Sequence, residues 1–91
     1  MIEVHLPRDL AREVGAEAVI AAPPQATLGE LLRALEQSHP GLLRRITEPG
    51  GSLRPHINVF IGERLARGAE GPALPLADRD EVWVIRAISG G

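Results

Sequence analysis

The sequence predicts an α+β domain in which one main helix covers one face of a sheet of four to five strands. Three observations support this fold class. Two strand-like runs open the chain, a capped amphipathic helix follows them, and two further strand-like runs lie in the second half. No segment repeats, and residues 1–87 suffice for one modest hydrophobic core. We therefore expect a single domain over residues 1–87.

The first two predicted strands form a hairpin. Ile2-Glu3-Val4-His5-Leu6 alternates apolar and polar residues, which is the period of a half-buried strand. A connection with a short helical turn at residues 9–12 leads to a second strand over residues 17–22, which is rich in alanine and therefore a weaker prediction. Pro23-Pro24 ends this strand. The short connection favours antiparallel pairing of the two runs.

The main helix is predicted to begin after Thr27. Thr27 and Glu30 form the T-x-x-E capping box, in which the threonine side chain accepts a hydrogen bond from the backbone of the glutamate. Four leucines then share one helical face: Leu28, Leu31, Leu32 and Leu35. Pro40-Gly41 ends the helix, and another helical turn is expected to pack on the same core through Leu42, Leu43 and Ile46.

The second half is predicted to contain two strands separated by irregular segments. Residues 48–55 contain two glycines and are expected to form an exposed loop. The run His56-Ile57-Asn58-Val59-Phe60-Ile61 is predicted to be a strand. Residues 63–77 are expected to form a loop with a short edge strand near Leu65. A tight turn at residues 78–80 then leads into the last strand, over residues 81–87.

The composition excludes several classes of function. The chain has no cysteine, so it has no disulfide framework, cysteine nucleophile or thiolate metal site. Its formal charge of −2 offers no basic patch for nucleic acid, and one Phe and one Trp are few for RNA stacking. No stretch approaches the ~20 apolar residues that cross a bilayer, and the start lacks the features of a signal peptide. We therefore expect a cytoplasmic protein that binds neither nucleic acid nor membrane.

The last residues, 88–91, are predicted to form a flexible tail ending in Gly90-Gly91. Glycine has no Cβ, so two in succession can pass through a channel too narrow for other residues and leave the terminal carboxylate accessible. All ten basic residues are arginine. Because lysine and cysteine are absent, the chain carries only its α-amino group as a strong nucleophile against a reactive acyl terminus.

Three motifs in order resemble the MoaD/ThiS family of sulfur-carrier proteins. They are the helix start T-L-G-E-L-L at residues 27–32, the strand N-V-F-I at residues 58–61, and L-A-D-R-D-E-V at residues 76–82, followed by a strand and Gly90-Gly91. One residue departs from the family pattern, because Arg79 stands where glycine is usual in the D-G-D turn. We expect a type I turn, which tolerates arginine at that position.

The resemblance implies the β-grasp fold of ubiquitin, with the first and last strands parallel at the centre of a mixed sheet. It also implies a protein cosubstrate that is not itself an enzyme and has no catalytic residues. A partner related to ubiquitin-activating enzymes uses ATP to adenylate the carboxylate of Gly91. A sulfur donor then displaces AMP, and the resulting thiocarboxylate supplies sulfur to an acceptor biosynthetic enzyme. Gly90 and Ser89 lead to the reactive residue, and the chain itself binds no cofactor.

The destination of the sulfur and two other classes of function stay open. Members of the family supply molybdopterin, thiazole, cysteine or thiolated tRNA synthesis. The long segment 36–56 and Arg54 ahead of Asn58 resemble carriers for cysteine synthesis, with molybdopterin carriers close behind. The alternatives are a ubiquitin-like modifier joined through Gly91 to lysines, and a β-grasp binding domain whose Gly-Gly end is accidental. An enzyme ranks last, because no set of base, nucleophile or metal ligands is apparent.

Strand alternation predicts which side chains a partner meets. The inward set contains Ile2, Val4, Leu6, Ile57, Val59, Ile61, Val82 and Val84. The outward set then contains His5, Phe60, Trp83 and Ile85. Exposed aromatic clusters often mark binding sites, and Trp is enriched among interface hot spots. We expect Trp83, Phe60 and Ile85 to contact the activating and acceptor enzymes; the alternative is that Trp83 belongs to the core.

Five polar residues are also candidates for a functional role: Arg86, the three histidines and Ser89. Arg86 lies just before the tail and is expected to steer it or to pair with acidic residues of a partner. The alternative for Arg86 is a solvated position at the strand end. The three histidines, His5, His39 and His56, lack a metal-binding spacing, so no metal site is expected. Ser89 has no base or nucleophile-elbow context, which argues against a catalytic serine.

Overall fold

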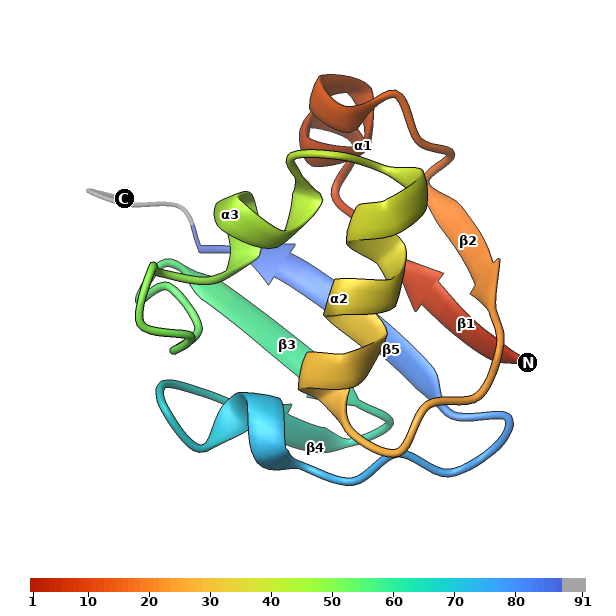
Figure 1. The fold of residues 1–91 in the computed structure, drawn as a ribbon, viewed down its shortest axis with the longest axis vertical. Coiled ribbons are helices and arrows are strands. Elements are labelled where there is room, and N and C mark those ends of the chain that lie inside the picture. Colours follow the sequence, from red (N-terminus) through yellow and green to blue (C-terminus); the bar gives the residue numbers. More distant parts are fainter. Residues whose placement is uncertain (88–91) are drawn as a thin grey trace.

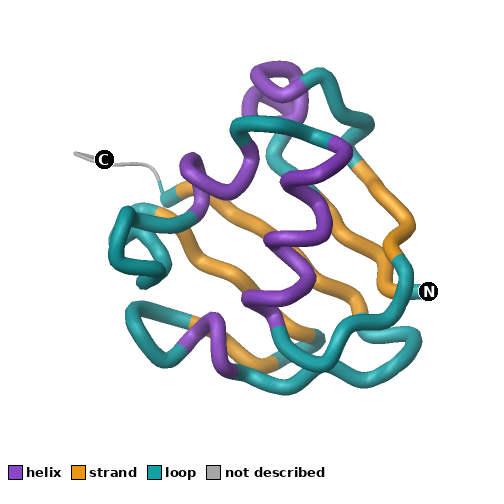
Figure 2. The backbone as a smooth tube through the Cα atoms, in the orientation of Figure 1, coloured by secondary structure: helices purple, strands orange, loops and turns teal. Residues whose placement is uncertain are grey.

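A five-stranded mixed sheet with helices on one face forms the fold (Figures 1 and 2). The structure is a computed structural model that describes residues 1–87, so the predictions for the tail, 88–91, lie outside the described residues. In chain order the elements are β1 (Ile2–His5), α1 (Arg8–Val14), β2 (Val19–Ala22), α2 (Leu28–Ser38), α3 (Leu42–Ile46), β3 (Ile57–Ile61), β4 (Arg64–Ala66), a 3₁₀ helix (Gly71–Ala73) and β5 (Glu81–Arg86).

The sheet has the β-grasp topology. Its strand order is β2-β1-β5-β3-β4, in which β1 and β5 are parallel and the other neighbours are antiparallel. The antiparallel pairs β1–β2 and β3–β4 thus flank β5, so the last strand lies in the middle of the sheet. This confirms the predicted fold class and the short edge strand near Leu65.

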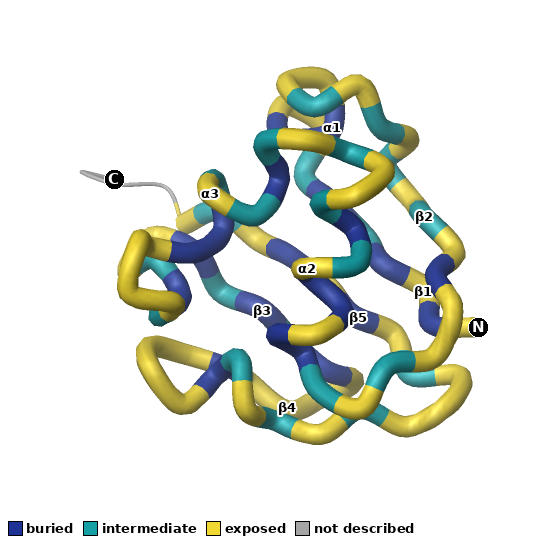
Figure 3. Tube along the Cα trace, viewed as in Figure 1, coloured by how far each residue is buried: buried dark blue, intermediate teal, exposed yellow. Residues whose placement is uncertain are grey.

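Helix α2 crosses one face of the sheet because one side of the helix is leucine (Figure 1). The backbone N–H of Glu30 donates to Thr27 Oγ1 at 3.2 Å, as the capping-box motif predicts. All four predicted leucines are buried with the inward faces of β1, β3 and β5, which Figure 3 shows as the dark-blue band beneath the helix. Gly29 is also buried, and a Cβ there would lie 3.1 Å from the carbonyl oxygen of Pro72. Glycine at this position therefore lets α2 approach the 3₁₀ helix closely.

Several boundaries differ from the sequence-based prediction. The first connection contains a full helix, α1, instead of a short turn, and Leu10 and Ala11 bring it into the core. Gly15 ends α1 in the left-handed conformation, with a φ of 69°. Strand β2 begins at Val19 rather than at residue 17, and β1, β3 and β5 are each one residue shorter at one end.

The prediction of an exposed loop over residues 48–55 is wrong at Leu53. This side chain is 2% exposed, and its backbone N–H donates to the carbonyl oxygen of Gly68 at 2.9 Å. A Cβ on Gly71 would lie 2.5 Å from the Leu53 Cδ1 atom, so the leucine fills the space that this glycine leaves. A single apolar residue held by tertiary contacts has no periodic signal, which is why the sequence did not reveal it.

The turn before β5 also differs from the expected type. The Asp80 N–H donates to the Ala77 carbonyl at 3.1 Å, which closes a four-residue turn, and Arg79 at its third position has a φ of 71°. Among the described non-glycine residues only Arg79 has a positive φ, so the turn is type II and not type I. The backbone N–H of Ala77 also donates to Asp80 Oδ2 at 2.7 Å, which braces the strained position.

Replacing Arg79 by glycine is expected to stabilise the fold. A side chain in the left-handed region costs roughly 1–2 kcal/mol, and the extra freedom of glycine in the unfolded chain offsets part of the gain. The net gain is about 0.5–1 kcal/mol, or roughly 2–6 °C in Tm for a domain of this size. Thermal unfolding of Arg79→Gly and Arg79→Ala tests this, because alanine keeps the Cβ. Equal gains in both variants would contradict backbone strain at this turn.

No helix in residues 1–87 is long and apolar enough to cross a membrane.

Candidate functional site

The end of β5 fixes where the C-terminal segment leaves the sheet. Strand β5 lies between β1 and β3, and its last ladder residue is Arg86, paired with Ile57. One further hydrogen bond, from the Ala87 N–H to the His56 carbonyl at 2.7 Å, holds the chain beyond the strand. The predicted reactive residue, Gly91, and the tail residues Ser89 and Gly90 follow this point and lie outside the described residues.

Arg86 is held by acidic residues of its own chain. Its Nη1 atom lies 2.6 Å from Asp9 Oδ2, and its Nη2 atom lies 3.1 Å from Glu13 Oε1. The same carboxylate of Glu13 accepts from Arg45 Nε on α3 at 3.1 Å. The network therefore ties α1 and α3 to the end of β5, close to where the tail begins. The guanidinium that was expected to pair with a partner already has two partners within the domain.

These pairs shift the ionisation of the groups involved. The hydrogen bond from Arg86 holds the pKa of Asp9 and the pKa of Glu13 below their usual values. Reciprocally, Glu13 raises the pKa of Arg86 further above its usual value. The sequence did not reveal this cluster because Asp9 and Glu13 are more than seventy residues away from Arg86. The sequence does show that Asp9 and Glu13 are four residues apart, which places both carboxylates on the same face of a helix.

This cluster predicts a pH dependence of stability. The pKa values of Asp9 and Glu13 are lowered in the folded state. The stabilisation is therefore fully present when the pH lies above the pKa values that these groups have in the unfolded chain. It is lost as the pH falls from there through the lowered folded-state values. The double variant Asp9→Asn, Glu13→Gln should therefore be less stable than the parent at neutral pH, and the difference should shrink in acid. Urea unfolding at both pH values measures it.

The matched control for the pH experiment is Glu17→Gln. Glu17 is exposed and makes no ion pair in the described part of the chain. Its substitution should leave the pH dependence unchanged. A double variant whose stability deficit is the same at neutral and acid pH would contradict the assignment of these two carboxyls.

The open face of the sheet carries a row of side chains with one residue from every strand. The register places them side by side in the order Val19, His5, Trp83, Phe60 and Leu65, from β2 to β4. Val19, Trp83 and Leu65 are exposed, and His5 and Phe60 are half-buried. The helices lie on the other face (Figure 1). The predicted inward set is buried, which confirms the assignment of faces and excludes a core position for Trp83.

Trp83 lies at the centre of this row, which we call the sheet-face row. It is 43% exposed, and its ring stacks on His5 with a centroid distance of 3.6 Å and an angle of 5°. Its indole Nε1–H donates to Glu81 Oε1 at 3.2 Å. Ile85 lies two residues further along β5 on the same face and is 42% exposed. The face thus presents a fixed aromatic ring with apolar neighbours, which is the composition of a protein-binding surface.

The register also brings together potential metal ligands that the sequence reasoning missed. His5 Nε2 lies 2.7 Å from Glu3 Oε1 and 3.7 Å from Glu81 Oε1. The spacing of the three histidines along the chain gives no sign of this group, because the neighbours of His5 are two glutamates, one of them on another strand. His39 and His56 do not belong to this group. The alternation of β1 places Glu3 and His5 on one face, but the β1–β5 register is needed to add Glu81.

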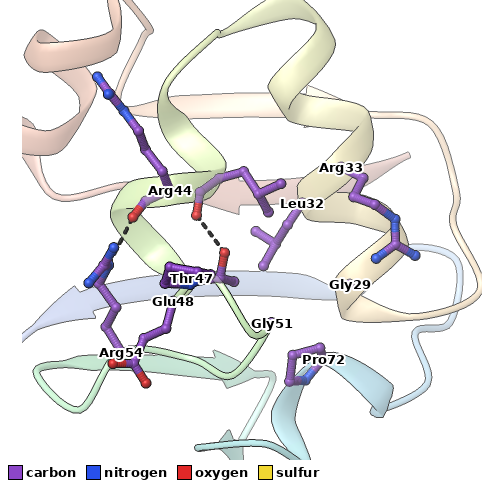
Figure 4. Close-up of a pocket in the computed structure, with 11 residues that line it drawn as sticks. Gly29, Leu32, Arg33, Arg44, Thr47, Glu48, Gly51, Arg54 and Pro72 are labelled. Atoms are coloured by element: carbon purple, nitrogen blue, oxygen red, sulfur yellow. Dashed lines mark hydrogen bonds between the residues drawn. The ribbon is translucent and has the colours of Figure 1, made fainter.

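A separate pocket of about 290 Å³ lies on the helical side (Figure 4). Its walls come from α2, α3, the 47–54 segment and the 3₁₀ helix. Two hydrogen bonds brace it: Arg54 Nε donates to the Arg44 carbonyl, and Thr47 Oγ1 donates to the Leu43 carbonyl, each at 2.8 Å. None of its lining residues belongs to the sheet-face row or to β5, so the pocket is separate from the predicted partner-binding residues.

Comparison with known proteins gives the same answer from sequence and from structure. The ThiS family model matches residues 4–91. The sulfur carrier protein CysO of Mycobacterium tuberculosis is 28% identical over 92 aligned residues, which cover 99% of this chain and 98% of CysO. Small archaeal modifier protein 1 of Haloferax volcanii is 36% identical over 93 aligned residues, which cover 99% of this chain and 100% of that protein.

Solved structures of these relatives have the same fold. The crystal structure of Mycobacterium tuberculosis CysO matches with a TM-score of 0.86 at 27% identity, covering 97% of this chain and 100% of the other. The crystal structure of the Haloferax volcanii modifier matches with a TM-score of 0.74 at 32% identity, covering 99% and 98%. A chain in the Amycolatopsis orientalis BexX/CysO complex matches with a TM-score of 0.86 at 24% identity, covering 100% of both chains, which shows likeness of fold.

Proposed function

This chain belongs to the ThiS family, and on that premise we propose that it is a sulfur-carrier protein whose Gly91 carboxylate is adenylated and then converted to a thiocarboxylate. The family match over residues 4–91 is the observation that carries this proposal. The Gly90-Gly91 end of the sequence supplies the group that reacts. The chain serves as a protein cosubstrate, and the catalytic groups and ATP belong to its partner.

The chemistry explains why a partner is required. A carboxylate is a poor electrophile, so one of its oxygens first attacks the α-phosphorus of ATP and pyrophosphate leaves. The mixed anhydride with AMP then has a good leaving group. A hydrosulfide equivalent attacks the acyl carbon, AMP departs with the electron pair, and the thiocarboxylate remains. This sequence of steps uses a nucleophile and an activated acyl group that meet in the partner's active site.

The geometry of β5 supports a docking role for the sheet-face row. Four residues follow Ala87, and a fully extended segment of that length spans at most about 14 Å. The adenylating centre must therefore lie within that distance of Ala87, the residue that follows β5. Trp83 and Ile85 are on this same strand. A partner that binds them therefore holds the start of the tail at a fixed distance from its own active site. We assign Trp83, with Phe60 and Ile85 around it, to the contact with the adenylating enzyme.

Arg86 plays a different part in this proposal. It is committed to Asp9 and Glu13, so its role is to fix the end of β5 against α1. A fixed exit point aims the tail at the partner's active site. A protein of this fold forms a complex with another protein in the BexX/CysO structure of Amycolatopsis orientalis, which is compatible with this arrangement.

Cysteine synthesis is the destination of the sulfur that we favour. The relative named as the sulfur carrier protein CysO matches this chain over nearly its whole length. Molybdopterin synthesis, the second candidate pathway, requires the same thiocarboxylate. Incubation of the thiocarboxylated chain with each acceptor enzyme and its substrate distinguishes the two pathways by which product incorporates the sulfur.

A ubiquitin-like modifier is the second candidate function, because the archaeal modifier protein 1 is 36% identical over 99% of this chain. Both fates begin with the same adenylate, and they differ in the nucleophile that attacks it. Attack by a lysine amine gives an isopeptide bond to another protein. The chain has no lysine, so it cannot extend such conjugates through its own side chains.

The experiment that tests the proposal measures adenylation of the chain directly. The chain is incubated with an enzyme that activates ThiS-family carriers, with ATP and with labelled pyrophosphate, and exchange of the label into ATP is measured. Exchange that depends on the chain supports adenylation of its carboxylate. A known carrier protein serves as the positive control for each enzyme. If the control supports exchange and this chain does not, both the carrier function and the modifier function are rejected.

A further inference from the structure

We propose that Glu3, His5 and Glu81 form a binding site for a divalent transition-metal ion, of which zinc is the best-suited example, on the open face of the sheet. The proposal concerns the folded domain alone and does not depend on the chemistry of the tail.

Sheet register brings the three side chains together. Glu3 and Glu81 are Cα partners across the parallel β1–β5 pair. His5 is two residues after Glu3 on the same strand, so all three side chains point to the same face of the sheet. Each contributes one ligand atom, and these atoms lie within 4.8 Å of one another. The two central strands therefore hold the group on rigid elements.

The distances suit a small ion. Zinc binds histidine nitrogen and carboxylate oxygen at about 2.0–2.2 Å, so tetrahedral ligand atoms are about 3.4 Å apart. His5 Nε2 lies 2.7 Å from the Glu3 oxygen and 3.7 Å from the Glu81 oxygen, which bracket that separation. The three ligand atoms already lie within 4.8 Å of one another, so side-chain rotations suffice to bring them to that separation. One ring nitrogen with two carboxylates favours a transition metal over calcium or magnesium, which prefer oxygen ligands alone.

Neighbouring contacts orient two of the ligands. Trp83 stacks on the His5 ring at 3.6 Å, and its indole N–H donates to Glu81 Oε1. Outer partners of this kind fix ligand orientation in metal sites. The His5 side chain is 16% exposed, whereas those of Glu3 and Glu81 are 54% and 56% exposed. Three protein ligands leave at least one coordination position open toward solvent and toward whatever docks on the face.

Calorimetric titration of the full chain with Zn²⁺ tests the proposal. One ion should bind per chain in a saturable manner. Co²⁺ provides a second readout, because the chain has a single Trp and the paramagnetic ion would lie beside it. We expect saturable quenching of Trp83 fluorescence by Co²⁺ and its reversal by Zn²⁺. His5→Gln and Glu81→Gln should each weaken Zn²⁺ binding at least about tenfold.

The matched control uses the other two histidines. The double variant His39→Gln, His56→Gln removes both of the other imidazoles and should bind Zn²⁺ as the parent does. Circular dichroism and thermal unfolding show that each variant is folded. The absence of saturable binding to the parent chain would overturn the proposal. Equal affinity in the His5→Gln variant would also overturn it, since any bound ion would then lie elsewhere.

Discussion

Deleting Gly90 and Gly91 abolishes thiocarboxylate formation and leaves the folded domain intact. The deletion leaves the terminal carboxylate on Ser89, two residues short of its reactive position and without the glycine lead, while the core and the last ladder pair lie upstream of it. The free energy of unfolding should change by no more than about 0.5 kcal/mol, as is usual for changes away from packed residues. Intact-mass analysis of the product and urea unfolding of the variant measure the two effects.

A finer variant separates the carboxylate from the narrow lead. Gly90→Val keeps the terminal carboxylate of Gly91 but adds a branched side chain next to it. If the channel admits only glycine, the rate of activation should fall by roughly a hundredfold, as expected when a reacting group is displaced by about an ångström. Ser89→Ala is the matched control and should react at the parental rate. Parental activity of Gly90→Val would show that the second glycine has no steric role.

Trp83→Ala reduces kcat/KM for activation by about thirtyfold or more. Truncating a central aromatic hot spot costs at least about 2 kcal/mol of binding free energy, which corresponds to that factor. The ring is 43% exposed, so the loss of folding stability should stay within about 1–2 kcal/mol, less than for a fully buried aromatic residue. Pyrophosphate exchange at a range of carrier concentrations gives kcat/KM, and thermal unfolding gives the stability change.

Leu65→Ala is the matched control for this prediction. Leu65 lies in the same sheet-face row and is 39% exposed, but it is on the edge strand β4. Residues at the rim of an interface contribute little binding energy, so this variant should lose less than about threefold. Equal losses in the two variants would contradict a contact that is centred on Trp83. An unchanged kcat/KM for a folded Trp83→Ala variant would exclude the sheet-face row as the docking surface.

Local patterns predicted most of the fold. The Thr27–Glu30 cap and the leucine stripe define α2, and strict alternation in β3 and β5 separates buried from outward residues correctly. Two predictions that were wrong concern features that depend on tertiary contacts or on the local backbone. Leu53 is buried only because Gly71 leaves space for it, and Arg79 adopts a left-handed conformation that residue preference alone argues against. The parallel pairing of β1 with β5 came from the family resemblance and not from periodicity.

The site was predicted in the parts that alternation controls. Trp83, Phe60 and Ile85 lie on the open face as expected, because side chains two residues apart share a face and neighbouring strands align them. The partners of Arg86 were not predictable, since Asp9 and Glu13 meet it only after the sheet has formed. The same reason hid the Glu3–His5–Glu81 group, which needs the register of two strands far apart in the sequence.

Intact-mass spectrometry of the full chain tests the carrier function most directly. The chain is incubated with ATP, an enzyme that activates ThiS-family carriers and a sulfur donor. The C-terminal fragment is then analysed by tandem mass spectrometry. The carrier function predicts a gain equal to the mass difference between sulfur and oxygen, located at Gly91 and dependent on ATP. A chain that keeps its mass, or that appears only as covalent adducts on other proteins, would contradict it.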